Sequence, residues 1–144
     1  MLNRLKRVFS CLETHEVRYL VIGGIAAILH GVPRVTLDAD LLIDGSSENA
    51  ARLISALREA GLGTAFLIEA DALLAQDITI FKDRVRVDVM TKAPGLDFET
   101  AWQRRETPAY EGQRFFMLCK ADLIASKRAA GRPQDIEDAR LLEL

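Results

Sequence analysis

The chain has few of the residues that cross-link small proteins or bind metals through sulfur and nitrogen. It contains two cysteines, Cys11 and Cys119, and two histidines, His15 and His30, in 144 residues. The cysteines are far apart, neither belongs to a Cys-x-x-Cys pair, and the histidines offer no ligand spacing to go with them. We therefore expect buried thiols rather than a disulfide framework or a zinc site.

The sequence also lacks a long hydrophobic run. The longest apolar stretch, residues 20–29, contains two glycines and ends at His30, well short of the roughly 18 residues that cross a bilayer. The N-terminus alternates apolar and basic residues and has no signal-peptide pattern. No membrane span is expected, and the cytoplasm is the expected location.

Charge of one sign is not in excess. The chain has 19 Lys and Arg against 21 Asp and Glu, a formal net charge of -2, so it has no global attraction for nucleic acid or anionic lipid. Any such binding must come from local patches. Length and composition predict a single domain over residues 1–144, with a core at about 17–92 and a helical part at about 93–144.

Hydrophobic spacing predicts helices and strands in alternation at the start of the chain. Helical spacing of apolar residues predicts a helix over residues 2–14, and the apolar β-forming run at residues 19–22 predicts a buried strand. Gly23 and Gly24 predict a tight turn into a helix over residues 25–30.

A second strand with one polar face is predicted over residues 34–43, where polar and apolar residues alternate. Ser46 and Ser47 are the expected N-caps of a helix that Gly61 ends. Residues 78–81 and 85–90 then predict a hairpin.

The remainder is predicted to be mostly helical. Helices are expected over residues 98–105, 120–130 and 134–142, with an extended piece at residues 113–118 between the first two.

Three aspartates carry the candidate chemistry. Asp38 and Asp40 stand two residues apart on one predicted strand, so their carboxylates leave the same face about 7 Å apart. Asp88 lies on the polar side of a later strand with Arg86. If the two strands are neighbours, three carboxylates converge, and their mutual repulsion calls for a cation. Oxygen ligands favour Mg²⁺ or Mn²⁺, and the alternative is a set of solvated aspartates on an edge strand.

Gly23 and Gly24 are candidates for binding a phosphate. A glycine pair between a strand and a helix lets backbone amides approach a phosphate, to which the helix dipole is favourable. A purely steric role in the turn is the alternative. Arg34, expected on the same strand face as Asp38 and Asp40, could clamp a phosphate or pair with the acids.

The order of these residues resembles the core signature of the polymerase β-like nucleotidyltransferase superfamily. The signature comprises Gly23-Gly24, thirteen intervening residues, Asp38-Ala39-Asp40-Leu41 and the later Val87-Asp88-Val89. A local set of residues is most similar to AbiEii-type bacterial nucleotidyltransferases, many of them linked to toxin–antitoxin systems. These residues are Gly23-Gly24-Ile25-Ala26, His30-Gly31, Arg34, Thr36, Asp38 and Asp40.

The resemblance implies an α/β (α+β) nucleotidyltransferase fold, a small mixed sheet flanked by helices with a helical C-terminal part. It implies a nucleoside triphosphate as substrate and Mg²⁺ or Mn²⁺ as cofactor. The implied catalytic residues and metal ligands are Asp38, Asp40 and Asp88, and the implied nucleotide-binding residues are Gly23, Gly24 and Lys127. For Lys127, a solvated position on its helix is the alternative.

The implied reaction transfers a nucleoside monophosphate to a hydroxyl of a protein, an RNA or a small molecule. The toxin-like relatives carry a larger helical region after the core, so the short stretch after Met90 favours a partner protein or a small molecule over RNA. A cognate toxin or antitoxin partner and a homodimer that completes the cleft are expected candidates. The alternative is a non-catalytic, nucleotide-binding or antitoxin-like module that acts by binding a partner.

Overall fold

The sheet has four strands whose order in space differs from their order in the sequence. The computed structural model describes residues 2–36 and 38–144, with the side chains of residues 2 and 3 outside the description. The strands are β1 (Tyr19–Ile22), β2 (Asp38–Ile43), β3 (Ile78–Lys82) and β4 (Arg86–Met90), arranged as β1-β2-β4-β3. The central pair β2 and β4 is parallel, and both outer pairs are antiparallel. The sheet is therefore mixed, as expected.

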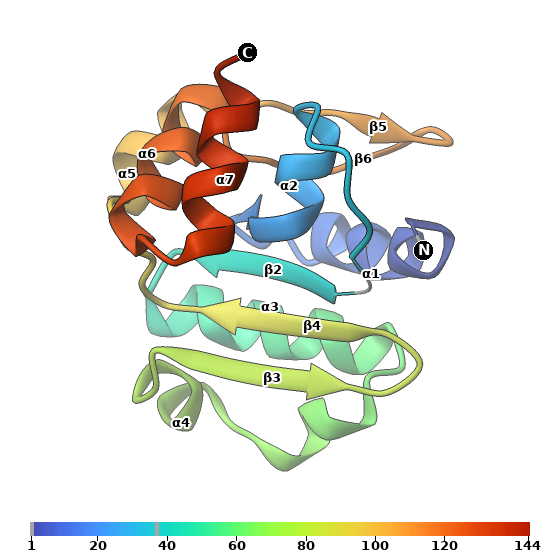
Figure 1. Ribbon diagram of the computed structural model, residues 1–144. Coiled ribbons are helices and arrows are strands. Elements are labelled where there is room, and N and C mark those ends of the chain that lie inside the picture. The colour runs from blue at the N-terminus through green and yellow to red at the C-terminus, as the bar shows by residue number, and fades with distance from the viewer. Residues whose placement is uncertain (1, 37) are drawn as a thin grey trace.

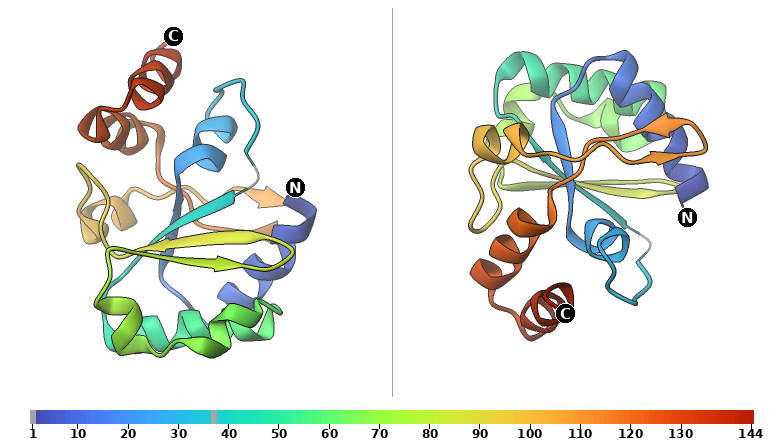
Figure 2. Two further views of the ribbon diagram at one scale, coloured as in Figure 1. Left: turned by 60° about the horizontal axis from the view of Figure 1, so that its bottom comes forward. Right: turned by 90° about the horizontal axis from the view of Figure 1, so that it is seen from above.

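Helices cover both faces of this sheet (Figures 1 and 2). One face packs against α1 (Leu2–Thr14), α3 (Ser47–Glu59) and α4 (Ala70–Leu74), with the short helix η1 (Gly63–Leu67) between the last two. On the other face stand α2 (Gly23–Leu29), α6 (Lys120–Ala130) and α7 (Pro133–Leu142). Within the described residues, no helix is both long and apolar enough to span a bilayer.

Local capping explains where α3 begins and ends. The Ser46 hydroxyl accepts a hydrogen bond from the Asn49 amide at 3.1 Å, which satisfies one of the free N–H groups of the first turn. Gly61 follows the last turn with φ +88°, a left-handed conformation that glycine adopts without a steric penalty. Both predictions for this helix are confirmed.

Among the predicted boundaries that differ from the structure, two lie next to the glycine turn and the aspartates. The second strand begins at Asp38 rather than at residue 34, because its partner β4 begins at Arg86, directly opposite Asp38. Residues 34–36 have no neighbouring strand, and Leu37 lies outside the described residues. The helix expected over residues 25–30 begins earlier, at Gly23.

The C-terminal part returns to the sheet. After α5 (Phe98–Gln103), a small hairpin of β5 (Ala109–Tyr110) and β6 (Gln113–Arg114) leads to a segment that runs beside β1. There the Val21 amide donates to the Phe116 carbonyl at 2.8 Å, and the Leu118 amide donates to the Val21 carbonyl at 3.1 Å. The extended piece predicted at residues 113–118 thus lies beside β1 through main-chain hydrogen bonds. The buried apolar side chains form one hydrophobic cluster that includes residues from Leu5 to Leu142.

Candidate functional site

Asp40 and Asp88 are direct partners across the parallel pair at the centre of the sheet. The register pairs Asp40 with Asp88 and Asp38 with Arg86. Side chains two residues apart on a strand leave the same face, so Asp38, Asp40 and Asp88 share one face of the sheet. The prediction that the two strands are neighbours is confirmed.

The glycine turn lies beside Asp40 because β1 ends at Ile22, which is paired with Asp40. Gly23 has φ +67°, and a β-carbon on it would stand 2.1 Å from Oδ2 of Asp40. The Gly24 amide lies near the Asp40 carboxylate and acts to lower its pKa. The turn therefore holds backbone, rather than a side chain, against this carboxylate.

The charged form of Asp40 is disfavoured by its surroundings. Burial and then the neighbouring charge of Asp88 raise the pKa of Asp40 from 3.8 to about 6, with a smaller contribution from Asp38. The Gly24 amide and the positive charge of Lys127 oppose this shift. The Asp40 carboxylate is thus incompletely neutralised by its surroundings.

Arg86 neutralises the second central carboxylate. Its guanidinium makes two hydrogen bonds to Asp88, Nε to Oδ1 at 2.8 Å and Nη2 to Oδ2 at 3.1 Å. The same Nε lies 3.7 Å from Oδ2 of Asp38. Sequence reasoning placed Arg86 on the face of Asp88 but assigned it no role, although the Arg-x-Asp spacing on a strand is the signal that could have identified this pair.

A cavity of about 260 Å³ opens over Asp40 and Asp88. Its polar lining comes from the sheet, the glycine turn and the two C-terminal helices, namely Gly23, Asp40, Asp88, Ser126, Lys127, Arg132 and Asp135. Asp38 lies outside this cavity and lines a separate hollow with Lys82 and Arg86. The structure therefore brings two of the three predicted carboxylates into one cavity and leaves the third outside it.

The carboxylates of the site fit a divalent cation only in part. Asp40 and Asp88 offer adjacent oxygen ligands, the kind that Mg²⁺ and Mn²⁺ prefer. The pKa of Asp40 is raised first by burial and then by the charge of Asp88, and a bound cation would favour the charged form against both effects. Among the described residues, no three His, Cys, Asp or Glu side chains are gathered as a metal site. Asp38 could join the other two only if its contact with Arg86 gave way.

Lys127 points inward from α6. It is buried, with Nζ 3.0 Å from Oδ2 of Asp138 and 3.5 Å from Oδ1 of Asp135, and it lines the cavity with Asp40 and Asp88. Of the two alternatives for this lysine, a solvated position on the helix is wrong.

Arg34 is not where the sequence predicted it. It precedes β2 instead of sharing the strand face of Asp38 and Asp40, and its Nη1 lies 2.6 Å from Oδ2 of Asp138. Because Asp138 belongs to α7, Arg34 ties the segment before β2 to the C-terminal helices.

Asp135 and Asp138 contact residues of the site, although the sequence alone assigned them no role in it. At the start of α7, Nε of Arg132 lies 2.6 Å from Oδ2 of Asp135. Both acids, however, are also buried partners of Lys127. Burial opposes their charged forms, but hydrogen bonds from Arg132 and Lys127 to Asp135, and from Lys127 and Gln134 to Asp138, hold both pKa values below the usual range. Their spacing of three residues on a helix was the available signal.

His30 connects two helices beside the cavity. Its Nε2 lies 2.8 Å from the Leu118 carbonyl oxygen, which joins the end of α2 to the start of α6. The ring is therefore an anchor between two elements that flank the cavity.

Comparisons with known proteins agree with this geometry. The fold resembles the crystal structure of a Thermotoga maritima protein provisionally named a nucleotidyltransferase, with a TM-score of 0.59 and 16% identity over 99% of this chain and 89% of that one. No curated protein matches the sequence. A family model described as "Nucleotidyltransferase of unknown function (DUF6036)" matches residues 2–144. Since that match spans nearly the whole chain, the protein belongs to this family of nucleotidyltransferases.

Proposed function

We propose that this protein is a metal-dependent enzyme that transfers a nucleoside monophosphate from a nucleoside triphosphate to a hydroxyl group. The observation that carries the proposal is the direct pairing of Asp40 with Asp88 beside a glycine turn that admits no side chain. Asp88 is buried and Asp40 is half-buried, and two adjacent carboxylates disfavour each other's charged forms, a repulsion that a bound cation would relieve.

In this proposal Asp38, Asp40 and Asp88 would hold Mg²⁺ or Mn²⁺. Such a cation, when bound, supplies positive charge to the α-phosphate and favours deprotonation of an attacking oxygen. The acceptor hydroxyl loses its proton to a carboxylate of the site, its oxygen forms a bond to the α-phosphorus, and the bond from that phosphorus to the bridging oxygen of the β-phosphate breaks. Pyrophosphate leaves.

The rest of the cavity would position the triphosphate. Gly23 and Gly24 leave space for a phosphate to approach the backbone. Lys127 contributes a positive charge on the opposite wall, where Asp135 and Asp138 fix its ammonium group. Arg34 supports this arrangement through Asp138 and is therefore a positioning residue rather than the phosphate clamp first considered.

The acceptor is a hydroxyl on a protein, an RNA or a small molecule. The finer resemblance to AbiEii-type enzymes makes the cognate member of a toxin–antitoxin pair the first protein acceptor to test. A homodimer that completes the cleft remains part of the proposal.

Transfer of label tests the function. The purified protein is incubated with Mg²⁺ or Mn²⁺ and each α-labelled nucleoside triphosphate, together with RNA, a product of an adjacent gene or small hydroxyl compounds. We expect label on one acceptor, and a loss of about 100-fold or more for Asp88→Asn with nucleotide affinity largely retained. Asp38→Asn should damage both rate and affinity. Asp77→Asn, an exposed aspartate just before β3, is the matched control, and absence of label from every acceptor would count against the proposal.

The competing candidate is a nucleotide-binding module without catalysis. It is favoured by one observation, that the described residues contain no ready three-ligand metal site. Calorimetry separates the candidates: triphosphate binding that is metal-independent and unchanged by Asp38→Asn and Asp40→Asn supports the module.

A further inference from the structure

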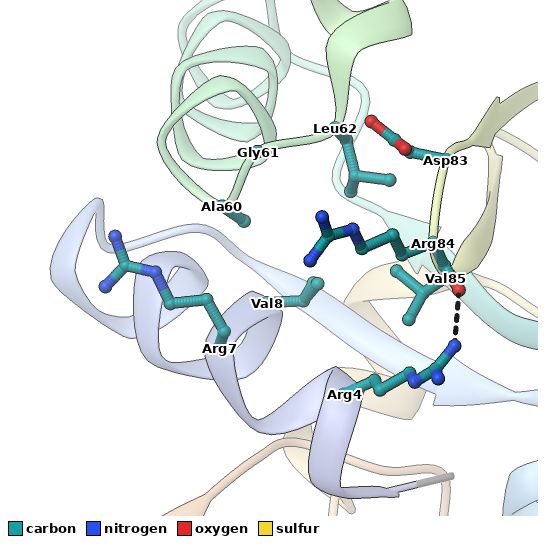
Figure 3. Close-up of a pocket in the computed structure, with 9 residues that line it drawn as sticks. All are labelled: Arg4, Arg7, Val8, Ala60, Gly61, Leu62, Asp83, Arg84 and Val85. Carbon is teal, nitrogen blue, oxygen red and sulfur yellow. Dashed lines mark hydrogen bonds between the residues drawn. The ribbon is translucent and has the colours of Figure 1, made fainter.

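A second and larger cavity lies on the other side of the sheet from the candidate site. Its volume is about 590 Å³, and it is enclosed by α1, the end of α3 and the turn of the β3–β4 hairpin. We call it the arginine cavity, because Arg4, Arg7 and Arg84 all line it. Figure 3 shows the Arg84 side chain reaching from the hairpin into the space between α1 and the α3 end.

These arginines differ from the others in lacking acidic partners. The chain has fourteen arginines, and ten of them form ion pairs with carboxylates. Of the remaining four, Arg105 stacks over Trp102, with its guanidinium carbon 3.9 Å from the ring centroid. The other three, all within the part of the chain that the structure describes, are Arg4, Arg7 and Arg84.

The hydrogen bonds inside the arginine cavity leave its charge uncompensated. Arg4 donates to the Arg84 carbonyl at 3.4 Å, and Arg7 donates to the Glu59 carbonyl at 3.3 Å. Neither bond brings a negative charge. The Arg84 guanidinium has no hydrogen-bond or ion-pair partner among the described residues. The one acid in the lining, Asp83, accepts a hydrogen bond from the Gly63 amide at 3.4 Å.

Positive charge continues from this cavity toward the candidate site. The adjoining hollow shares Asp83, Arg84 and Val85 with the arginine cavity and extends to Lys82, Arg86 and Asp38. The strand registers place Asp38, Arg86 and Lys82 in one row across the sheet. Lys82 forms no ion pair with the described residues. Two cations without acidic partners, Arg84 and Lys82, therefore lie along the hairpin between the arginine cavity and Arg86, which contacts Asp38.

We propose that the arginine cavity binds phosphate groups of a single-stranded nucleic acid whose terminal hydroxyl approaches the site at Asp38. Guanidinium groups match phosphate oxygens with paired hydrogen bonds, and cations spread over a hairpin and a helix suit several phosphates in a row better than one. The net charge of -2 makes this local patch, and not the protein as a whole, the attractive element. The acceptor role rests on the proposed function, whereas the binding does not.

Fluorescence anisotropy with a labelled short single-stranded RNA measures the binding directly. The triple variant R4Q/R7Q/R84Q should bind at least about tenfold more weakly than the wild type, and its affinity should fall less steeply with salt, by about 0.7 in log–log slope for each phosphate contact removed. The control triple R114Q/R128Q/R140Q removes the same charge from exposed arginines that have acidic partners elsewhere. It should bind nearly as the wild type does.

Further arms separate the outcomes. Equal weakening by both triples, or no RNA binding by the wild type at low salt, overturns the proposal. It is also overturned if inorganic phosphate or an acidic peptide binds through the three arginines more tightly than RNA does. Asp88→Asn should bind RNA as the wild type does. If RNA binding depends on the three arginines but neither the wild type nor any variant transfers label, the result contradicts the proposed function and leaves this inference intact. Transfer to a different acceptor with arginine-independent RNA binding contradicts this inference alone.

Discussion

Gly23 and Asp40 are so close that a β-carbon on the glycine would lie 2.1 Å from a carboxylate oxygen of the aspartate. The two residues come from different elements: the glycine begins α2 directly after β1, and the aspartate lies inside β2. Since φ at Gly23 is +67°, the position restricts side chains twice, by the backbone conformation and by the contact. The glycine and the carboxylate thus form one structural unit.

Gly23→Ala should therefore impair both stability and the site. The left-handed backbone alone costs about 1–2 kcal/mol for a residue with a β-carbon, and displacement of the carboxylate should reduce transfer strongly. Urea unfolding and the label assay measure the two effects. Gly45→Ala, where a β-carbon meets no atom within 4 Å, is the control. In the double variant with Asp40→Ala, part of the lost stability should return; a strictly additive result would contradict the proposed contact.

Asp40→Asn should stabilise the metal-free protein near neutral pH. The pKa of Asp40 is raised from 3.8 to about 6, so between these values the folded protein binds more protons than the unfolded chain, and the free energy of unfolding falls as pH rises. The penalty is complete above about pH 6. Unfolding in chelator should show the variant about 1–3 kcal/mol more stable at pH 7.5, with the difference vanishing near pH 4. The same difference at both pH values would contradict the raised pKa, and Asp77→Asn serves as the control.

Arg86→Gln should lower the stability of the metal-free protein and raise its affinity for metal. The change leaves the buried Asp88 carboxylate without its two charged hydrogen bonds, at a cost of about 1–3 kcal/mol in metal-free buffer. It also frees Asp88 and Asp38 from a competing cation, so Mn²⁺ binding measured by calorimetry should tighten. Arg86→Lys keeps the charge but not the paired geometry and should fall between the two proteins. Weaker Mn²⁺ binding by Arg86→Gln would show that Arg86 assists the metal rather than competing with it.

Lys127→Met should destabilise the C-terminal helices as well as weaken nucleotide binding. The lysine is the shared partner of Asp135 and Asp138, which are both buried. Removing one member of a buried ionic cluster costs about 3 kcal/mol, and triphosphate affinity should fall about tenfold. Lys120→Met changes an exposed lysine at the start of the same helix and should alter neither quantity. Unchanged triphosphate affinity with lowered stability would restrict Lys127 to a structural role.

Local patterns in the sequence were sufficient to identify most elements. The helix after Ser46, the hairpin at residues 78–90 and both C-terminal helices follow from periodicity and capping, which depend on neighbours within one or two turns. The same local rule places Asp38 and Asp40 on one face of their strand. The segment that forms η1 and α4 carried no signal that was recognised, because short helices bury too few residues to establish a period.

Tertiary structure decided which residues meet. The parallel pairing of β2 with β4 sets Asp40 opposite Asp88, although β3 comes before β4 in the chain. No local pattern specifies that register, because it depends on how helices from both ends of the chain pack against the sheet. Arg34 illustrates the same limit: alternation placed it with Asp38, whereas folding pairs it with Asp138, 104 residues away. The sequence by itself determined the carboxylates, the glycine turn and their order; only the packing of distant segments determined that Asp40 meets Asp88, that Arg86 restrains Asp88, and that Lys127 faces them.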